Sequence, residues 1–281
     1  MRKLLLVGVA GLFGAVIAAG QQVSIVDVYI AKVKPEKRGD FDAISKKIAD
    51  ANRKHKGDVW TTSQVEYGEQ NTLYFTSGRS NYAAIDDGSK AFQSAIKESY
   101  GAAAMEKLMR DSDSCLISSR GEIRRVRADL SSNMTSDPAA LFKLIGQSRF
   151  VRTTMVRVRP GKTLNFEEQI RMVKGAGERE NPSRVTLVSQ SSVGQTGALF
   201  YLTNWGDSMA ALDPPNVPRL LGESGYQRFS SMSAENTLGV ETIITRYLPE
   251  LSNPPAEIVA ADPSFWTPKP PAPSKPKPPA N

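Results

Sequence analysis

The chain has 281 residues, of which 40% are hydrophobic and 23% are charged. These fractions are ordinary for a globular protein, and they exclude a collagen-like chain, a chain disordered throughout and a multi-spanning membrane protein. The formal net charge of +7 is spread along a sequence of mixed signs, which argues against a nucleic-acid-binding surface. We therefore expect no nucleic-acid partner.

Residues 1–20 have the layout of a secretory signal peptide. Arg2 and Lys3 precede an apolar run without charge, and small residues stand before a cleavage site after Gly20. We therefore predict an exported protein, either periplasmic or extracellular. The alternative is an uncleaved N-terminal membrane anchor, because the run is about long enough to span a bilayer.

The next part of the chain contains a pattern that recurs later. Residues 32–35, Lys-Val-Lys-Pro, are followed by Phe41, and residues 157–160, Arg-Val-Arg-Pro, are followed by Phe166 at the same spacing of 125 positions. Leu73-Tyr74-Phe75 resembles Leu199-Phe200-Tyr201, 126 positions later. A matched order at a nearly constant offset indicates an internal duplication. The two copies are assigned to residues 23–131 and 150–252.

Each copy predicts the same order of elements: a strand that ends at a proline, a helix, a β-hairpin, a broken helical region and a last strand. Asp40 and Asn165 are expected to cap the first helix of each copy, just ahead of the phenylalanines. Further strands are predicted at 59–67, 72–76, 115–126, 185–193, 198–203 and 240–247, and the broken helical regions at 82–109 and 209–232.

The order βαββαβ predicts an α+β fold of two ferredoxin-like repeats. A four-stranded sheet with two helices on one face leaves its other face bare, and two copies can cover these faces by packing sheet against sheet. We therefore predict an intramolecular pseudo-dimeric α+β barrel with a pocket between the sheets. Because one chain supplies both copies, a monomer is expected.

Two segments lie outside the copies. Residues 132–149 are predicted to be a linker with a short helix, since Asp137 precedes Pro138 in the pattern of a capped helix start. Residues 253–281 are interpreted as a disordered tail rich in proline and lysine, with an extended polyproline-type backbone.

The sequence contains one cysteine, Cys115, and one histidine, His55. One cysteine allows no internal disulfide, and these two residues are too few for a metal site built from histidine and cysteine clusters. His55 lies at the charged end of a predicted helix, where it is expected to face solvent. We therefore predict no metal, no cofactor and no catalytic residue.

The stretch 156–167, with its Arg-Pro-Gly-Lys strand end followed by Phe166, resembles the opening of dimeric α+β barrel proteins. The similarity is to the antibiotic-biosynthesis-monooxygenase-like and NIPSNAP-like branches, and residues 200–209 resemble their third strand and its exit into a helix. The resemblance covers both copies. It implies a pocket between sheet and helices, in a family that includes cofactor-free oxygenases, haem-handling enzymes and many proteins without known chemistry. The chain departs from the active branches, which often place a histidine in the second helix or on haem.

The first strand of each copy supplies the candidate ligand-binding residues. Asp27 and Tyr29 alternate on one side of the first strand, and Arg152 and Thr154 are their counterparts in the second copy. Our hypothesis is that Asp27 and Arg152 lie near the pseudo-twofold axis as a pair that fixes an anionic or polar molecule. The alternatives are a structural ion pair or strand ends in solvent. Further candidates are Trp60, Trp205, Gln64 and Gln190.

The resulting functional hypothesis is an exported tandem barrel that binds a small, partly apolar ligand in the inter-sheet pocket. One alternative is a cofactor-independent monooxygenase-like enzyme that uses the same pocket. Another is an envelope-associated scaffold or interaction protein that contacts the cell envelope through the Pro/Lys tail. The sequence does not decide whether the protein is an enzyme, and it favours a non-catalytic role.

Overall fold

The computed structural model describes residues 23–134 and 137–267. The predicted signal peptide and the tail beyond residue 267 lie outside the described residues. The strands are β1 (Ile25–Val33), β2 (Thr61–Tyr67), β3 (Thr72–Arg79), β4 (Leu116–Val126), β5 (Phe150–Val158), β6 (Leu187–Val193), β7 (Leu199–Gly206) and β8 (Thr237–Tyr247). The α-helices are α1 (Arg38–His55), α2 (Ala83–Tyr100), α3 (Ala102–Ser114), α4 (Pro138–Gln147), α5 (Thr163–Glu180), α6 (Val217–Asn236), α7 (Ala256–Ala261) and α8 (Pro263–Trp266).

The eight described strands form one closed antiparallel barrel in the order β1-β3-β2-β8-β5-β7-β6-β4. This confirms the α+β class and the barrel. The two predicted sheets are not separate layers, because β2 pairs with β8 and β4 pairs with β6. Pairing at both seams satisfies backbone groups that an open sheet edge would leave exposed.

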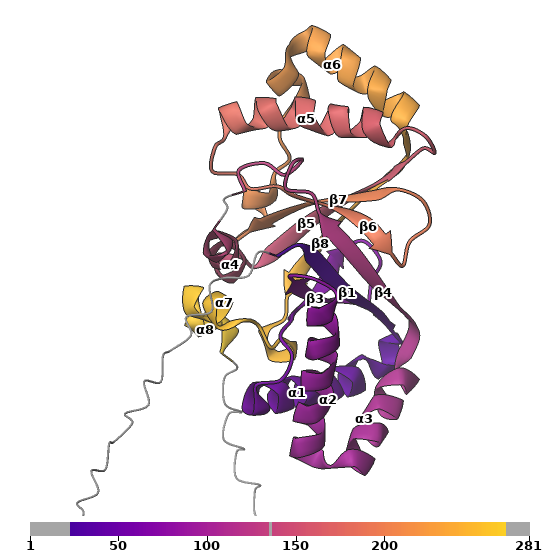
Figure 1. Cartoon of the computed structure of the whole chain (residues 1–281), viewed down its shortest axis with the longest axis vertical. Helices are drawn as coiled ribbons and strands as arrows, with labels where there is room; N and C mark the ends of the chain where they lie inside the picture. Colours follow the sequence, from indigo (N-terminus) through magenta and orange to yellow (C-terminus); the bar gives the residue numbers. More distant parts are fainter. Residues whose placement is uncertain (1–22, 135–136, 268–281) are drawn as a thin grey trace, which may run out of the picture.

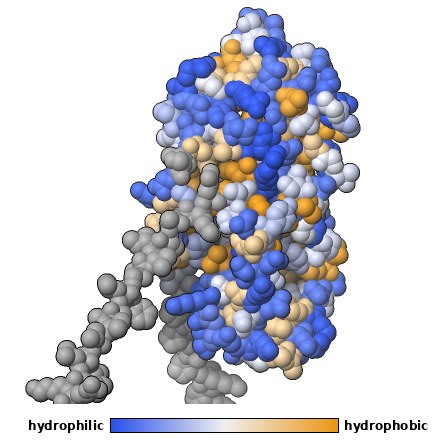
Figure 2. Space-filling model, in the orientation of Figure 1, coloured by the Kyte–Doolittle hydropathy of each residue, from blue (hydrophilic) through white to orange (hydrophobic). Residues whose placement is uncertain are grey.

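Two helical layers enclose the barrel from opposite sides (Figure 1). Helices α1, α2 and α3 cover the strands of the N-terminal half, residues 23–131, and α5 and α6 cover those of the C-terminal half, residues 150–252. The visible face is mainly hydrophilic, with scattered hydrophobic residues (Figure 2). Among the described residues, none of the helices is long and apolar enough to cross a membrane.

The strand registers place equivalent residues of the two halves at equivalent positions. Asp27 pairs with Ser77 on β3, and Arg152 pairs with Asn204 on β7. By the same registers Phe75 corresponds to Leu202, so the sequence match of residues 73–75 with 199–201 is shifted by one residue. The reason is that the hairpin between β6 and β7 holds one residue more than that between β2 and β3.

The first helix of each half begins earlier than predicted. Helix α1 starts at Arg38 after a 3₁₀ turn, Pro35–Lys37, and α5 starts at Thr163, so Asp40 and Asn165 lie inside the helices and are not their N-caps. A carboxylate in the first turn still interacts favourably with the helix dipole. The linker helix is confirmed: the Asp137 side chain accepts a hydrogen bond from the Ala139 backbone N–H at the start of α4.

The prediction of disorder from residue 253 is wrong for residues 253–267. Asn253 forms a β-bridge with Trp60, and this segment contains α7 and α8. The Trp266 side chain is only 1% exposed, packs against Tyr247 and donates a hydrogen bond from Nε1 to the Gly146 carbonyl oxygen at 2.8 Å. Burial of a large aromatic side chain stabilises this segment against the barrel end.

Candidate functional site

The interior of the barrel is filled by side chains rather than open. Its cavity has a volume of only about 140 Å³. A cavity between the sheets is therefore present as predicted, but it is small because the inward-facing residues of the strands occupy most of this space.

A buried ionic network occupies part of this interior. Glu122 is 1% exposed and lies 2.7 Å from Nη2 of Arg124, and it accepts hydrogen bonds from Tyr201 Oη at 2.8 Å and from Arg120 Nε at 2.9 Å. Burial raises the pKa of Glu122, but Arg124 and the hydrogen bonds outweigh burial and hold the pKa below its usual value. The carboxylate is fully satisfied by the protein itself, which favours a structural role.

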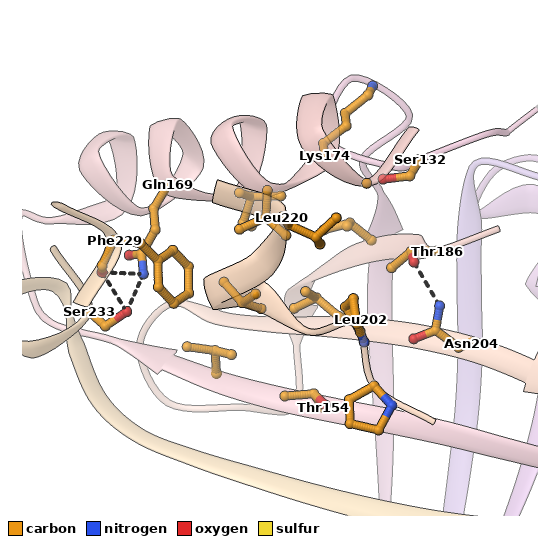
Figure 3. Close-up of a pocket in the computed structure, with 18 of the residues that line it drawn as sticks. Ser132, Thr154, Gln169, Lys174, Thr186, Leu202, Asn204, Leu220, Phe229 and Ser233 are labelled. Atoms are coloured by element: carbon orange, nitrogen blue, oxygen red, sulfur yellow. Dashed lines mark hydrogen bonds between the residues drawn. The ribbon is translucent and has the colours of Figure 1, made fainter. Parts of the chain in front are cut away.

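A larger cavity lies between the helices α5 and α6 and the sheet of the C-terminal half, and we call it the C-terminal cavity. Its volume is about 1150 Å³ (Figure 3). Its walls are mainly apolar and include Val156, Ile170, Val188, Leu202, Leu220 and Phe229. A cavity of this size lined by apolar side chains with a few polar groups is typical of a small-molecule site.

The chain around the start of α6 shapes one wall of the C-terminal cavity. Pro214 and Pro215 cannot continue a helix, so the chain runs irregularly from Asp213 until Asn216 caps α6 by accepting a hydrogen bond from the Arg219 backbone N–H at 3.0 Å. Gly222 then interrupts α6 with a φ of 67°, a conformation that favours glycine. The break at Gly222 bends α6, and the part of the helix after the bend contacts α5, where Gln169 donates a hydrogen bond to Ser233.

The two ends of the C-terminal cavity are polar, with Leu202 and Leu220 between them (Figure 3). At one end Gln169 Nε2 donates to Ser233 Oγ and, at 3.4 Å, to the Phe229 carbonyl oxygen. At the other end Asn204 Nδ2 donates to Thr186 Oγ1 at 2.7 Å.

Two arginines belong to the Asn204 end. Arg152 faces Asn204 across the β5–β7 pair, and Arg184 lies two residues before Thr186. Burial lowers the pKa of Arg152, and the neighbouring positive charge of Arg184 lowers it further. Burial also lowers the pKa of Arg184, although Asp213 opposes this shift.

A smaller cavity of about 320 Å³ lies under the helices of the N-terminal half, and we call it the N-terminal cavity. Arg79 lines it and is neutralised: its Nη1 lies 2.6 Å from Asp58 Oδ1, and its Nη2 lies 3.5 Å from Asp27 Oδ2. Burial raises the pKa of Asp27, and the opposing effect of Arg79 is smaller. Arg79, the one basic residue among those lining this cavity, is therefore neutralised by the protein, whereas the acidic lining residues Asp27, Asp58 and Asp113 outnumber it.

The structure separates the predicted pair of Asp27 and Arg152. Both positions face helices rather than the barrel interior, so Asp27 and Tyr29 line the N-terminal cavity while Arg152 and Thr154 line the C-terminal cavity. The pairing hypothesis is wrong because β1 and β5 are not neighbours in the barrel. Instead, Asp27 forms its ion pair with Arg79.

The side chains of the four remaining candidates form hydrogen bonds with other groups of the protein. Trp60 and Trp205 both line the small cavity of the barrel interior, and Trp60 also lines the N-terminal cavity. Trp60 donates from Nε1 to the Leu251 carbonyl oxygen at 2.8 Å, and Trp205 donates from Nε1 to Tyr247 Oη at 3.0 Å. Gln64 accepts a hydrogen bond from Arg38, and Gln190 accepts one from Arg127. Neither glutamine lines a described cavity.

Sequence reasoning missed Arg184, Asn204 and Gln169. Arg184 lies in the irregular segment between α5 and β6, where Asn133 Nδ2 donates to its backbone carbonyl oxygen at 2.8 Å. This contact and the hydrogen bond from Arg184 Nη1 to the Asp213 carbonyl oxygen join segments that are distant in sequence, and they fix its place. Asn204 offered no local signal either, because the sequence offset of 126 matches Ser77 with Thr203, and only the strand registers show that Asn204 corresponds to Ser77.

The C-terminal cavity does not suit haem held by a usual axial ligand. Iron in haem is commonly bound by histidine, cysteine, methionine or tyrosine, and none of these lines the cavity among the described residues. His55 lies on α1 in the other half, 2.9 Å from Glu98. Within residues 23–134 and 137–267, no cluster of three or more potential metal-binding side chains is present.

No family model and no curated protein matches the chain. Solved structures with a similar arrangement include an anthrone oxidase-like protein (14% identity, 81% of this chain and 92% of that chain, TM-score 0.49). They also include chlorite dismutase from Candidatus Nitrospira defluvii in complex with imidazole (8%, 82% and 93%, TM-score 0.47) and a haem-binding protein from Thermus thermophilus (11%, 82% and 93%, TM-score 0.45). At these TM-scores the likeness carries no argument about the activity of this chain.

Proposed function

We propose that this protein binds a small, partly apolar molecule in the C-terminal cavity. The observation that carries the proposal is the cavity itself, with a volume of about 1150 Å³ and mainly apolar walls. Transfer of apolar groups from water into such a site contributes about 0.8 kcal/mol per CH₂ group. The polar ends would orient the molecule, since a few placed polar groups usually give such sites their specificity.

The chemistry at the Asn204 end supports binding better than catalysis. Its side chains are the guanidinium groups of Arg152 and Arg184, the amide of Asn204 and the hydroxyl of Thr186. These groups donate hydrogen bonds but are poor proton-transfer groups at neutral pH. Of the two carboxylates that line the cavity, Glu180 is engaged with Arg219.

The proposal includes an internal duplication of the chain and its export. The equal registers of β1 with β3 and of β5 with β7 support a tandem duplication that forms an internal pseudo-dimer of ferredoxin-like repeats. Such a pseudo-dimer would act as a monomer. The charged start and apolar run of residues 1–20 support export, so that the cavity would meet its ligand outside the cytoplasm.

The test transplants side chains of the N-terminal cavity into the C-terminal cavity. Tyr29 and Phe75 stand where the C-terminal half has Thr154 and Leu202. The double variant Thr154→Tyr/Leu202→Phe therefore adds two rings at positions where the same framework already accommodates them. We expect the wild-type protein to bind the neutral fluorescent probe N-phenyl-1-naphthylamine, and the double variant to bind it about tenfold or more weakly.

The matched control adds a ring outside the cavity, at the exposed Val193, as Val193→Phe. This variant should bind the probe like the wild type. Near-ultraviolet circular dichroism and thermal unfolding check that all three proteins are folded. Equal probe affinity in the wild type and the folded double variant, or no binding by the wild type, would contradict the proposal.

A further inference from the structure

Two of the three arginines that line the C-terminal cavity, Arg152 and Arg184, form no ion pair with a carboxylate among the described residues. Arg152 makes no ion pair and no side-chain hydrogen bond within the part of the chain that the structure describes. Arg184 donates from Nη1 to the backbone carbonyl oxygen of Asp213, while its Nη2 is buried without a hydrogen-bond partner. An unpaired buried donor on a charged group is costly, so such a group calls for an explanation.

The strand pairing brings both guanidinium groups to one end of the cavity. Arg152 and Asn204 are directly opposite on β5 and β7, and side chains of directly opposite residues project on the same face of a sheet. Asn204 Nδ2 donates to the Val185 carbonyl oxygen at 2.8 Å and to Thr186 Oγ1, which ties Asn204 to the segment that carries Arg184. Arg152, Arg184, Asn204 and Thr186 therefore surround one end of the cavity.

The charges that line the whole C-terminal cavity leave an excess of positive charge. The basic residues are Arg152, Lys174, Arg184 and Arg219, and the acidic residues are Glu180 and Asp213. Glu180 pairs with Arg219, and Lys174 donates to the Asp129 carbonyl oxygen at the rim at 3.2 Å. Asp213 is the remaining carboxylate, and it accompanies two arginines whose pKa values are lowered mainly by burial.

The N-terminal half shows how the same fold neutralises a buried arginine. Arg79 is held by Asp58 and Asp27, and Asp27 occupies the position that corresponds to Arg152. In the C-terminal half Arg152 stands where the N-terminal half has Asp27. The C-terminal cavity therefore has a positive charge at the position from which Asp27 neutralises Arg79 in the N-terminal cavity. A bound anion would supply the negative charge that the protein does not place beside Arg152 and Arg184.

We propose that the ligand of the C-terminal cavity is an amphiphilic oxyanion, a carboxylate or phosphate head on an apolar body. This inference rests on the proposed function and specifies its ligand class. The head lies between Arg152 and Arg184, because guanidinium groups bind oxyanions by paired, charge-assisted hydrogen bonds. The Thr186 hydroxyl accepts from Asn204 and keeps its own hydrogen for the head group.

The apolar body extends from this head along the middle of the cavity. Leu202 on β7 and Leu220 on α6 lie between the Asn204 end and the Gln169 end, as Figure 3 shows. The distant amide of Gln169 is already occupied by Ser233 and Phe229. The cavity therefore offers one charged end and an apolar body, which matches an acid with a single head group better than a molecule charged at both ends.

The test compares ligands of equal chain length: decanoate, decyl phosphate and the neutral 1-decanol. Each is titrated as a competitor of N-phenyl-1-naphthylamine against the wild-type protein and the variants Arg152→Gln, Arg184→Gln and Arg152→Lys. We expect the wild type to bind an anion about tenfold or more tightly than the alcohol. Each glutamine variant should lose most of that preference while binding the alcohol as before, and Arg152→Lys should keep part of it.

The control Arg228→Gln removes a positive charge from the exposed side of α6, outside the cavity, and should leave the preference intact. A higher affinity for decyl phosphate than for decanoate would identify a phosphate head, and the reverse a carboxylate. Equal affinity of the wild type for the alcohol and both anions would overturn this inference and leave the proposed function standing. Failure of the probe and of all three ligands to bind would remove the proposed function itself.

Discussion

The two helix-covered cavities are built on equivalent strands yet differ in what fills them. In the N-terminal cavity, Tyr29 and Phe75 pack together with ring centroids 5.9 Å apart, and Phe41 contacts Phe75 edge-on at 6.3 Å. The corresponding strand positions of the C-terminal cavity hold Thr154 and Leu202. The volumes are about 320 and 1150 Å³. A few side chains and the bend of one helix thus convert a packed layer into an open cavity.

The halves also differ in whether the arginine of their cavity has a carboxylate partner, Arg79 being buried and Arg152 half-buried. Arg79 is 9% exposed and is neutralised by two carboxylates, whereas Arg152 has none. A buried cation held by its own carboxylates stabilises the fold only while the pair is intact. A buried cation without a partner costs stability and is kept where a function needs it. The comparison therefore supports a structural role for the charges of the N-terminal cavity and the proposed binding role for those of the C-terminal cavity.

The largest expected effect comes from the same substitution in both halves. Arg79→Met leaves Asp58 and Asp27 without their cation, and it should lower the free energy of unfolding by about 3 kcal/mol. Arg152→Met removes an unpaired, half-buried charge and should leave the free energy of unfolding unchanged or raise it. Urea denaturation followed by tryptophan fluorescence measures both. Equal losses in the two variants would refute the contrast between the halves.

A smaller effect is expected when the N-terminal cavity is opened. The double variant Tyr29→Thr/Phe75→Leu introduces the side chains of the other half and removes the packed rings. We expect a loss of about 1–3 kcal/mol in the free energy of unfolding, from the lost burial and the new cavity. The variant should also gain a second, weaker site for N-phenyl-1-naphthylamine, seen as a doubled stoichiometry. Unchanged stoichiometry would show that these two positions do not control the cavity.

The smallest effect is a difference in pH dependence between two aspartates. Arg127 lowers the pKa of Asp129, beside the C-terminal cavity, to about 2 from the ordinary 3.8, so its stabilisation is present above pH 3.8 and is lost as the pH falls towards 2. Burial raises the pKa of Asp27, so ionised Asp27 weakens the fold above pH 3.8 and this cost is relieved as the pH falls.

Asp129→Asn should therefore flatten the loss of stability in acid, and Asp27→Asn should steepen it. Melting temperatures between pH 2 and pH 5 measure both slopes, with about 1 kcal/mol or less expected for the half-exposed Asp129. Slopes that change in the same direction in the two variants would contradict the assigned pKa directions.

The alternation of residues along β1 and β5 was enough to group the right side chains. It placed Asp27 with Tyr29 and Arg152 with Thr154 on common faces, and the registers confirm their equivalence. Both faces of these strands are covered, one by the other strands across the barrel interior and one by the helices. The alternation of residues therefore does not show which side chains point into the barrel. That is why the pocket was expected between the sheets.

Other features depended on contacts that no local pattern reports. Arg184 is positioned by Asn133, which is distant in sequence, so its role in the cavity had no local signal. The order of residues 253–267 had a signal that composition concealed, since Ile258 and Trp266 are apolar residues within a proline-rich stretch and both are buried. Averaging composition over the whole end of the chain merged this packed segment with the Pro/Lys run that follows it.

The closed barrel has a consequence for how the chain is made. Ser63 on β2 pairs with Tyr247 on β8, so one edge of the hairpin of β2 and β3 stays unpaired until a strand 184 residues further along the chain (247 − 63) has been synthesised. An unpaired edge strand is a template for association with other chains, and pairings between residues far apart in sequence form slowly. Before β8 has been synthesised, the edge of β2 has no strand to pair with. We therefore expect the risk of aggregation to be highest while the chain is being synthesised.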